Sequence, residues 1–155
     1  MMFSKERVEL TQELMILLAD YWNDVDTNWG RNAGDYYTDD AIFESSRNTY
    51  NGKAKIQQFY QWRIDRGVNR TAVHSFLNFR AVPTGPDTAT CTWYLVLYAN
   101  DGNPIHPSAP PIQIAYMTDK CLKGADGKWR YTHRKFDTWF EGGVPTTSPN
   151  LDDKK

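Results

Sequence analysis

Apolar residues recur every three or four positions in two stretches of the first half of the chain. The first stretch covers residues 5–29 and the second covers residues 53–66. This spacing predicts two amphipathic helices, each with one side packed on a core. Between them we expect a short helix over residues 31–37 and a short strand over residues 41–44.

The period of the pattern changes from 3.6 to 2 after about residue 70. Alternation predicts four strands, at residues 71–82, 88–100, 112–122 and 128–140. Clusters rich in Gly, Pro, Asn and Asp separate them, as is typical of turns between antiparallel neighbours. Helices followed by strands favour an α+β fold with the helices on one face of an antiparallel sheet.

Length and composition refine this picture. A chain of 155 residues fits one domain, which we place at residues 1–145, and the polar stretch 146–155 is expected to be a loose tail. The 7 Phe, 6 Trp and 9 Tyr exceed what a small core needs for volume. Because Trp and Tyr combine an apolar body with a polar group, this surplus indicates a lined cavity, a subunit interface or both. A large aromatic core with no cavity is the alternative.

Charge and motifs exclude several classes of function. With 18 basic and 19 acidic residues and no long run of one sign, the chain has no surface expected to bind nucleic acid. The apolar run at residues 14–19 is too short for a signal sequence or a membrane span. Neither the two Cys nor the three His show metal-ligand spacing, and no phosphate-binding loop is present. We therefore expect a cytoplasmic protein without a metal that binds neither nucleic acid nor membrane.

Five sequence features carry a resemblance to a known family. They are Tyr21 five residues before Asp26, the acidic run 38–44, Gly52 ahead of the second helix, the strand run 71–78 and the closing run 127–134. In order and spacing they resemble the nuclear transport factor 2-like superfamily, and within it the SnoaL-like and scytalone dehydratase-like group. The resemblance implies a cystatin-like cone, in which a strongly curved antiparallel sheet and the long helices enclose a pocket.

The strand run contains an unusual polar set. Residues two and four apart on a strand share a face, so His74, Phe76 and Asn78 are expected to point the same way. In dehydratase-like relatives, the aspartate at the position of Asp26 holds the strand histidine, which moves a proton in the pocket. Such a carboxylate fixes the tautomer of the imidazole and stabilises the imidazolium that forms. The resemblance thus implies a catalytic Asp26–His74 pair. Phe76 and Asn78, on the same strand face, are expected to contact the substrate, with Asn78 as a hydrogen-bond donor to a developing oxyanion.

The tyrosines depart from the pattern of scytalone dehydratase. That enzyme has a tyrosine immediately before the aspartate, where this chain has Val25, and a second on the first strand, where this chain has Glu44. Dehydration of the same substrate is therefore not expected. Other tyrosines are candidates for the pocket wall, and the sequence does not choose among Tyr21, Tyr60, Tyr94, Tyr98 and Tyr116.

Together these features predict a proton-transfer enzyme that needs no cofactor. It would be an isomerase, dehydratase or cyclase acting on an apolar, ring-containing small molecule. Two alternatives stay open: a non-catalytic cavity protein, in which Asp26 and His74 are a satisfied core pair, and a β-type subunit of a ring-hydroxylating dioxygenase. The aromatic surplus and the open outer face of such a sheet also predict a homodimer or homotrimer.

Overall fold

The computed structural model describes residues 3–152. The elements follow one another as α1 (Lys5–Asn28), the 3-10 turn η1 (Ala33–Tyr36), β1 (Tyr37–Glu44), β2 (Thr49–Asn51), α2 (Lys53–Asp65), β3 (Arg70–Gly85), β4 (Thr88–Asp101), β5 (Gln113–Lys123) and β6 (Trp129–Glu141). The α+β class is as expected, and both long helices lie within one residue of their predicted bounds. The short strand β2 was not expected, because three residues are too few to show an alternating pattern.

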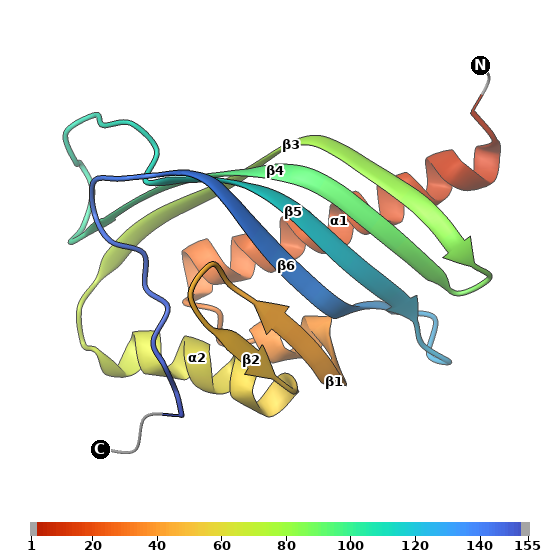
Figure 1. The fold of residues 1–155 in the computed structure, drawn as a ribbon, viewed down its shortest axis with the longest axis horizontal. Helices are drawn as coiled ribbons and strands as arrows, with labels where there is room; N and C mark the ends of the chain where they lie inside the picture. The colour runs from red at the N-terminus through yellow and green to blue at the C-terminus, as the bar shows by residue number, and fades with distance from the viewer. Residues whose placement is uncertain (1–2, 153–155) are drawn as a thin grey trace.

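The six strands form one sheet in the order β2-β1-β6-β5-β4-β3 (Figure 1). From β3 to β6, each strand pairs antiparallel with the next strand in the sequence. One pair departs from the expected antiparallel arrangement, since β1 lies parallel to β6. No hairpin joins these two strands, because α2 carries the chain away to the opposite edge of the sheet, so their relative direction is not set by a turn.

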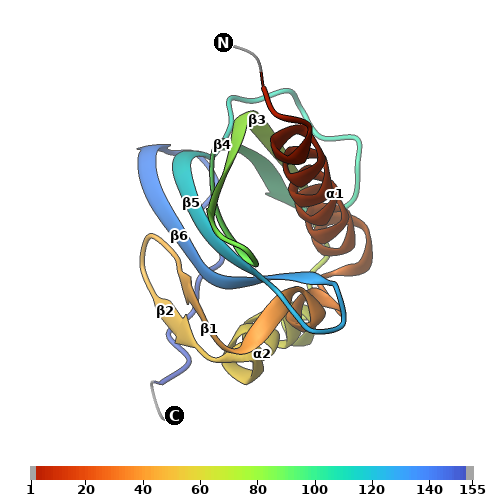
Figure 2. The ribbon, with the colours of Figure 1, turned by 90° about the vertical axis from the view of Figure 1, so that its right-hand side faces the viewer.

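The sheet curves strongly and its concave side is covered by helices. In Figure 2 the strands wrap around α1, which contacts β3, while α2 packs against β1, β2 and η1. The inward positions of β4 and β5 alternate regularly with outward ones. This one-sided burial is what the period-2 pattern predicts for a sheet with one covered face.

A β-bulge interrupts β3 at Asn78. The strand register shifts between Leu77 and Arg80, and Asn78 adopts the left-handed region with a φ of 53°. Asn tolerates this conformation better than most residues, and an extra residue at a bulge reverses the side-chain alternation beyond it. Phe79 therefore packs on Phe76, with ring centroids 6.1 Å apart, whereas Asn78 is exposed.

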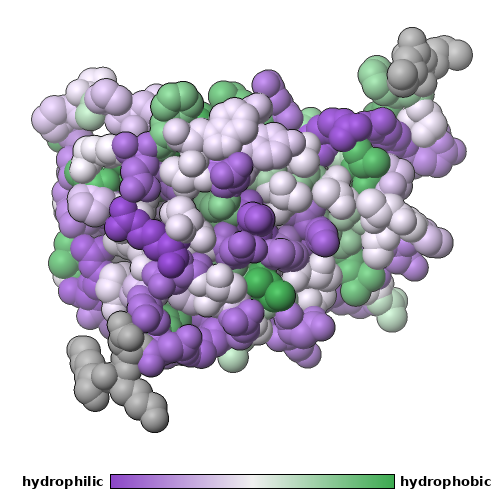
Figure 3. Space-filling view, in the orientation of Figure 1, coloured by the Kyte–Doolittle hydropathy of each residue, from purple (hydrophilic) through white to green (hydrophobic). Residues whose placement is uncertain are grey.

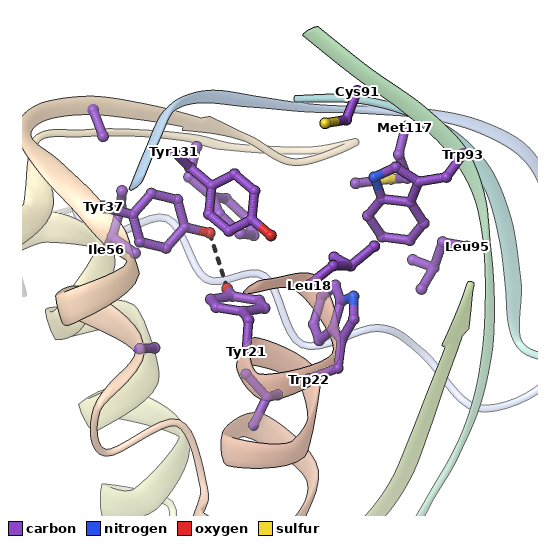
Figure 4. Packing of buried hydrophobic residues seen from close by; sticks show 14 of the residues in the cluster. Leu18, Tyr21, Trp22, Tyr37, Ile56, Cys91, Trp93, Leu95, Met117 and Tyr131 are labelled. Carbon is purple, nitrogen blue, oxygen red and sulfur yellow. Dashed lines mark hydrogen bonds between the residues drawn. The ribbon is translucent and has the colours of Figure 1, made fainter. Parts of the chain in front are cut away.

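The core is mainly aromatic and contains one buried ion pair. Figure 4 shows Tyr21 and Trp22 of α1 facing Trp93 and other side chains of the sheet. Arg134, also fully buried, donates from Nε and Nη2 to Asp119 at 2.8 and 3.0 Å. A buried charge is tolerated only when it is paired and hydrogen-bonded, and Asp119 fulfils that requirement.

The segment after β6, which the structure describes as far as Asp152, is bound to the sheet and is not the loose tail that was expected. Its backbone carbonyls accept hydrogen bonds from the Tyr50 hydroxyl (to Pro149, 2.8 Å) and from Arg70 Nη2 (to Pro145, 3.0 Å). The expectation rested on polar composition, which does not reveal partners on β2 and β3 for the backbone of the segment. The expected tail residues 153–155 lie outside the described residues.

The surface seen in the orientation of Figure 1 is mixed. Figure 3 shows hydrophilic and intermediate residues over most of this face, with hydrophobic residues in small separate patches. Among residues 3–152, no helix has both the length and the apolar character needed to cross a membrane.

Candidate active site

A small cavity lies between the concave side of the sheet, α2 and the segment after β6. Its walls are formed by side chains from both helices, from β1, β3, β4, β5 and β6 and from the C-terminal segment, among them Trp22, Tyr60, Arg63, His74, Leu95, Gln113 and Thr146. Its volume is about 60 Å³, which accommodates a few water molecules. An apolar cavity that binds benzene measures about 150 Å³, so a ring-containing ligand requires this cavity to widen.

The predicted Asp26–His74 pair meets at this cavity. Asp26 belongs to the last turn of α1, and His74 lies on β3. His74 Nδ1 is 2.6 Å from Asp26 Oδ1, and the His74 backbone N–H donates to Asp26 Oδ2 at 2.9 Å. One carboxylate therefore holds both the ring and the backbone of His74, which fixes where the imidazole lies.

The imidazole is also held by stacking, and only one of its nitrogens is bonded to a described residue. The rings of His74 and Trp22 are 4.0 Å apart and only 4° from parallel. His74 Nε2 makes no hydrogen bond with any residue in the described range 3–152, and the side chain, 8% exposed, lines the cavity. The ring is thus fixed at Nδ1, while Nε2 has no partner among residues 3–152 and is left for a ligand in the cavity.

The surroundings of His74 favour its neutral form. Burial lowers the pKa of His74 below its usual 6.5, and this effect outweighs the opposite effect of the hydrogen bond and charge of Asp26. The positive charges of Arg63 and Arg134 lower the pKa further. With Nδ1–H donating to Asp26, the neutral ring carries its lone pair on Nε2, which is the form required of a general base.

Of the candidate tyrosines, Tyr60 lines the cavity, and Tyr21 contacts Tyr60 on the side away from the cavity. The hydroxyls of Tyr60 and Tyr21 are hydrogen-bonded. The Tyr37 hydroxyl donates to that of Tyr21 at 2.9 Å, the bond drawn in Figure 4. Burial raises the pKa of all three phenols, so they remain protonated and available as donors. Tyr60 is therefore the phenol placed to donate to a ligand oxygen.

Two other predicted tyrosines lie on the opposite face of the sheet. Tyr94 and Tyr116 pair across β4 and β5 and pack with Trp139, at ring distances of 5.4 and 5.7 Å from it. Their neighbours Leu95 and Ala115 occupy the inward positions. The expectation that these two tyrosines contact substrate thus does not agree with the pleat of the strands.

Phe76 and Asn78 lie apart from the cavity walls. Phe76 points inward as expected, but it packs against Trp93 with ring centroids 6.3 Å apart instead of lining the cavity. Asn78 is turned outward by the bulge and is exposed, so the role of hydrogen-bond donor expected for it does not agree with its position.

Arg63 is the main cavity residue that the sequence analysis did not identify. It reaches the cavity from α2, with its guanidinium carbon 6.0 Å from the Phe59 ring centroid and 5.8 Å from that of Tyr60. The sequence held a signal for it, because Arg63 lies on the apolar stripe of the helix predicted at residues 53–66. A charged residue on a core-facing stripe is uncommon and indicates a special environment.

These observations define a class: an α+β protein whose curved sheet and helices enclose a cavity with a histidine–aspartate pair. Among the residues described, no group of three His, Cys, Asp or Glu side chains gathers as a metal site requires. The sequence profile of the family described as "SnoaL-like domain" matches residues 6–135. The chain therefore belongs to the SnoaL-like family of the nuclear transport factor 2-like superfamily, and the resemblance found in its sequence is confirmed.

Solved structures share this fold at low sequence identity. ActVI-ORFA from Streptomyces coelicolor is 16% identical, with a TM-score of 0.72 over 84% of this chain and 97% of that one. A Nostoc punctiforme protein of unknown function with a cystatin-like fold is 19% identical, with a TM-score of 0.66 over 89% and 95%. A Catenulispora acidiphila protein in complex with S-DNPA is 16% identical, with a TM-score of 0.67 over 84% and 94%. No curated protein sequence matches the chain significantly.

Proposed function

We propose that the protein catalyses proton transfer on an apolar, ring-containing small molecule, without a cofactor, in the cavity described above. The observation that carries this proposal is the arrangement of His74. Its Nδ1 is bound to Asp26 and its ring is stacked on Trp22. Its side chain lines the cavity, and its Nε2 makes no hydrogen bond to any described residue. A core pair with only a structural role is expected to have both ring nitrogens satisfied by protein groups.

The reaction follows from these positions. His74 Nε2 takes a proton from an acidic C–H of the substrate, and the electron pair of that bond moves into an adjacent carbonyl to give an enolate. The imidazolium that forms is stabilised by Asp26, and the enolate oxygen accepts a hydrogen bond from Tyr60. Return of the proton to another carbon gives an isomerisation. Its transfer to a departing hydroxyl group gives a dehydration, and its transfer to an alkoxide formed by ring closure gives a cyclisation.

The relatives support the proposal at the level of the family. The chain is a SnoaL-like domain, and a neighbour of the same fold has been solved with the small molecule S-DNPA bound. Because these solved neighbours are less than 20% identical to this chain, they support the scaffold, and the residues named above carry the chemistry.

Deuterium exchange tests the proposal directly. Ring ketones with acidic C–H groups are incubated with the protein in deuterium oxide, and incorporation of deuterium is followed by NMR. We expect His74→Gln to lower the exchange rate by about 10²-fold or more, because it removes the general base. The matched control is His133→Gln, which removes an imidazole bonded to Glu44 on the outer face. Full exchange activity in folded His74→Gln protein contradicts the mechanism.

The same experiment separates the alternative functions. A protein that binds ring compounds but exchanges no proton with any of them is a non-catalytic binding protein, and the Asp26–His74 pair is then structural. A native mass that includes a larger, different chain indicates instead a β-type subunit of a ring-hydroxylating dioxygenase. An enzyme of the proposed kind is expected to have the mass of a homodimer or homotrimer.

A further inference from the structure

Arg63 is a cation with no partner among the residues described. It lines the same cavity as His74 and Tyr60, is half-buried, and makes no ion pair or hydrogen bond with any residue in the range 3–152. Removing a charge from water is costly unless an opposite charge or hydrogen-bond partners replace the solvent. An unpaired guanidinium in a cavity wall is therefore unusual for a purely structural residue.

The described carboxylates near Arg63 are paired with other residues. Asp101, at the end of β4, is shared by Arg66 and Arg70, at 3.3 and 3.1 Å. Among residues 3–152, none of those that line the cavity is an Asp or a Glu. Asp26 contacts His74 from behind the cavity wall and uses both of its oxygens there. The walls of the cavity thus carry an excess of positive charge.

The aromatic rings hold the Arg63 guanidinium, while its N–H groups have no acceptor in the part of the chain that the structure describes. Phe59 and Tyr60 of the preceding turn lie within 6.0 Å of its central carbon, an interaction with the ring faces that does not use the donors along its edge. The planar guanidinium fork matches the two oxygens of a carboxylate. A guanidinium held in place with its donors open is pre-organised for such a ligand.

We propose that the ligand carries a carboxylate, which Arg63 binds, so that Arg63 determines specificity for ring-containing carboxylates over their neutral analogues. The orientation of the ligand, with its ring toward His74, rests on the proposed function. The binding of the carboxylate does not. A purely structural role is the alternative, since Arg63 also lies in the last turn of α2, where a cation stabilises the helix dipole.

Binding of matched probes tests the proposal without any chemical step. The probes are benzoate and naphthoate, each paired with its neutral amide, and their dissociation constants are measured by isothermal titration calorimetry. We expect each carboxylate that binds to bind more tightly than its amide by about tenfold or more, as for a charge-assisted pair. Arg63→Gln should abolish that preference, and Arg63→Lys should retain part of it.

Arg66→Gln is the matched control, because it removes the same charge from the next turn of the chain and does not line the cavity. It should keep the carboxylate preference. Thermal unfolding of each variant checks that it is folded. If Arg63→Gln does not fold, Arg63→Lys tests the proposal, and an undiminished preference in that variant overturns it. The proposal is overturned if no carboxylate binds, if carboxylate and amide bind equally, or if Arg63→Gln keeps the preference.

Failure of this inference and failure of the proposed function give different results. If the carboxylate preference depends on Arg63 but no substrate exchanges protons, the inference stands and the protein is a binding protein. If His74-dependent exchange occurs with neutral ketones and the preference is absent, the enzyme proposal stands and Arg63 has a structural role.

Discussion

The properties of His74 come from a competition between two effects at one residue. Burial disfavours the imidazolium, whereas the hydrogen bond and negative charge of Asp26 favour it, and burial has the larger effect on the pKa. The folded protein therefore holds His74 neutral at pH values where a histidine in the unfolded chain is already protonated. The consequence is a pH dependence of both activity and stability.

Stability is expected to fall on acidification because of His74. As the pH drops below about 6.5, the unfolded chain binds a proton at this histidine before the folded protein does, so protonation favours unfolding until the lowered pKa of the folded state is reached. Urea unfolding at pH 7.5 and 5.5 measures this for the wild type and for His74→Gln. The free energy of unfolding of the wild type minus that of His74→Gln should be smaller at pH 5.5 than at pH 7.5. A difference that is larger at pH 5.5 indicates that Asp26 affects the pKa of His74 more than burial does.

Activity should follow the same titration. Because only neutral His74 acts as a base, the exchange rate is expected to decline on the acid side only below pH 6.5, at the lowered pKa of the folded protein. A pH profile of the exchange reaction in wild-type protein gives this value. A decline that begins clearly above pH 6.5 assigns the limiting titration to another group.

At this scale the sequence predicted part of the site. The Asp26–His74 pair followed from the resemblance and from the position of a histidine on an alternating strand. The stacking of Trp22 on His74 and the arrival of Arg63 from α2 did not follow, because both depend on how the helices pack against the sheet. Local patterns give the face of an element but not its neighbours across the core.

At the scale of the element, the bulge in β3 decides which side chains reach the interior. Strict alternation places Asn78 inside, and the left-handed residue reverses that order so that Phe79 and Ala81 are the inward ones. Nothing in an alternating pattern marks a bulge, since any short stretch fits either phase. The sequence therefore predicted the strand but not its phase beyond Leu77.

Substitutions at Asn78 test this interpretation. Asn78→Gly should keep the free energy of unfolding near that of the wild type, because glycine adopts a φ of about 53° without a steric penalty. Asn78→Val should lower it by about 1–2 kcal/mol, since a β-branched residue is strained there. Urea unfolding measures both. Neither variant should weaken ligand binding, and a loss of binding in stable Asn78→Gly protein returns Asn78 to the candidate site.

The segment after β6 is the element most directly connected with access to the cavity. Thr146, Thr147 and Ser148 form one wall, and the Tyr50 hydroxyl holds the neighbouring carbonyl of Pro149. The segment thus closes one side of a cavity of only about 60 Å³. We therefore expect the segment to move when a ring-containing ligand enters.

Shortening the chain tests that expectation. A variant that ends at Val144 should bind naphthoate with a faster association rate than the wild type, because the wall is missing. A variant that ends at Asp152 keeps the wall and is the matched control. Stopped-flow fluorescence of the tryptophans measures both rates. Equal rates in all three proteins show that ligands enter by another route.

At the scale of the whole molecule, several aromatic residues that do not line the cavity lie together on the outer face of the sheet. A row of side chains crosses four strands there: Leu77 pairs with Tyr94, Tyr94 with Tyr116, and Trp139 stacks on Tyr116. Leu77 and Trp139 are each 53% exposed. Contiguous apolar side chains on a surface are typical of an interface, and the composition had indicated a cavity, an interface or both. In this structure, the outer face and the cavity each account for part of the aromatic residues.

The homo-oligomer predicted from composition is expected to form through this row. Trp139→Glu replaces an exposed ring of this row by a charge and should weaken self-association by about 2 kcal/mol or more, as for an aromatic residue that contributes strongly to an interface. Sedimentation velocity over a range of concentrations measures the effect. Ile16→Glu, at an exposed apolar position of α1, is the matched control and should leave the mass unchanged. A wild-type monomer at high concentration rejects the oligomer altogether. If Trp139→Glu protein associates normally, the interface lies on another face, because a glutamate cannot be buried in an interface without a partner.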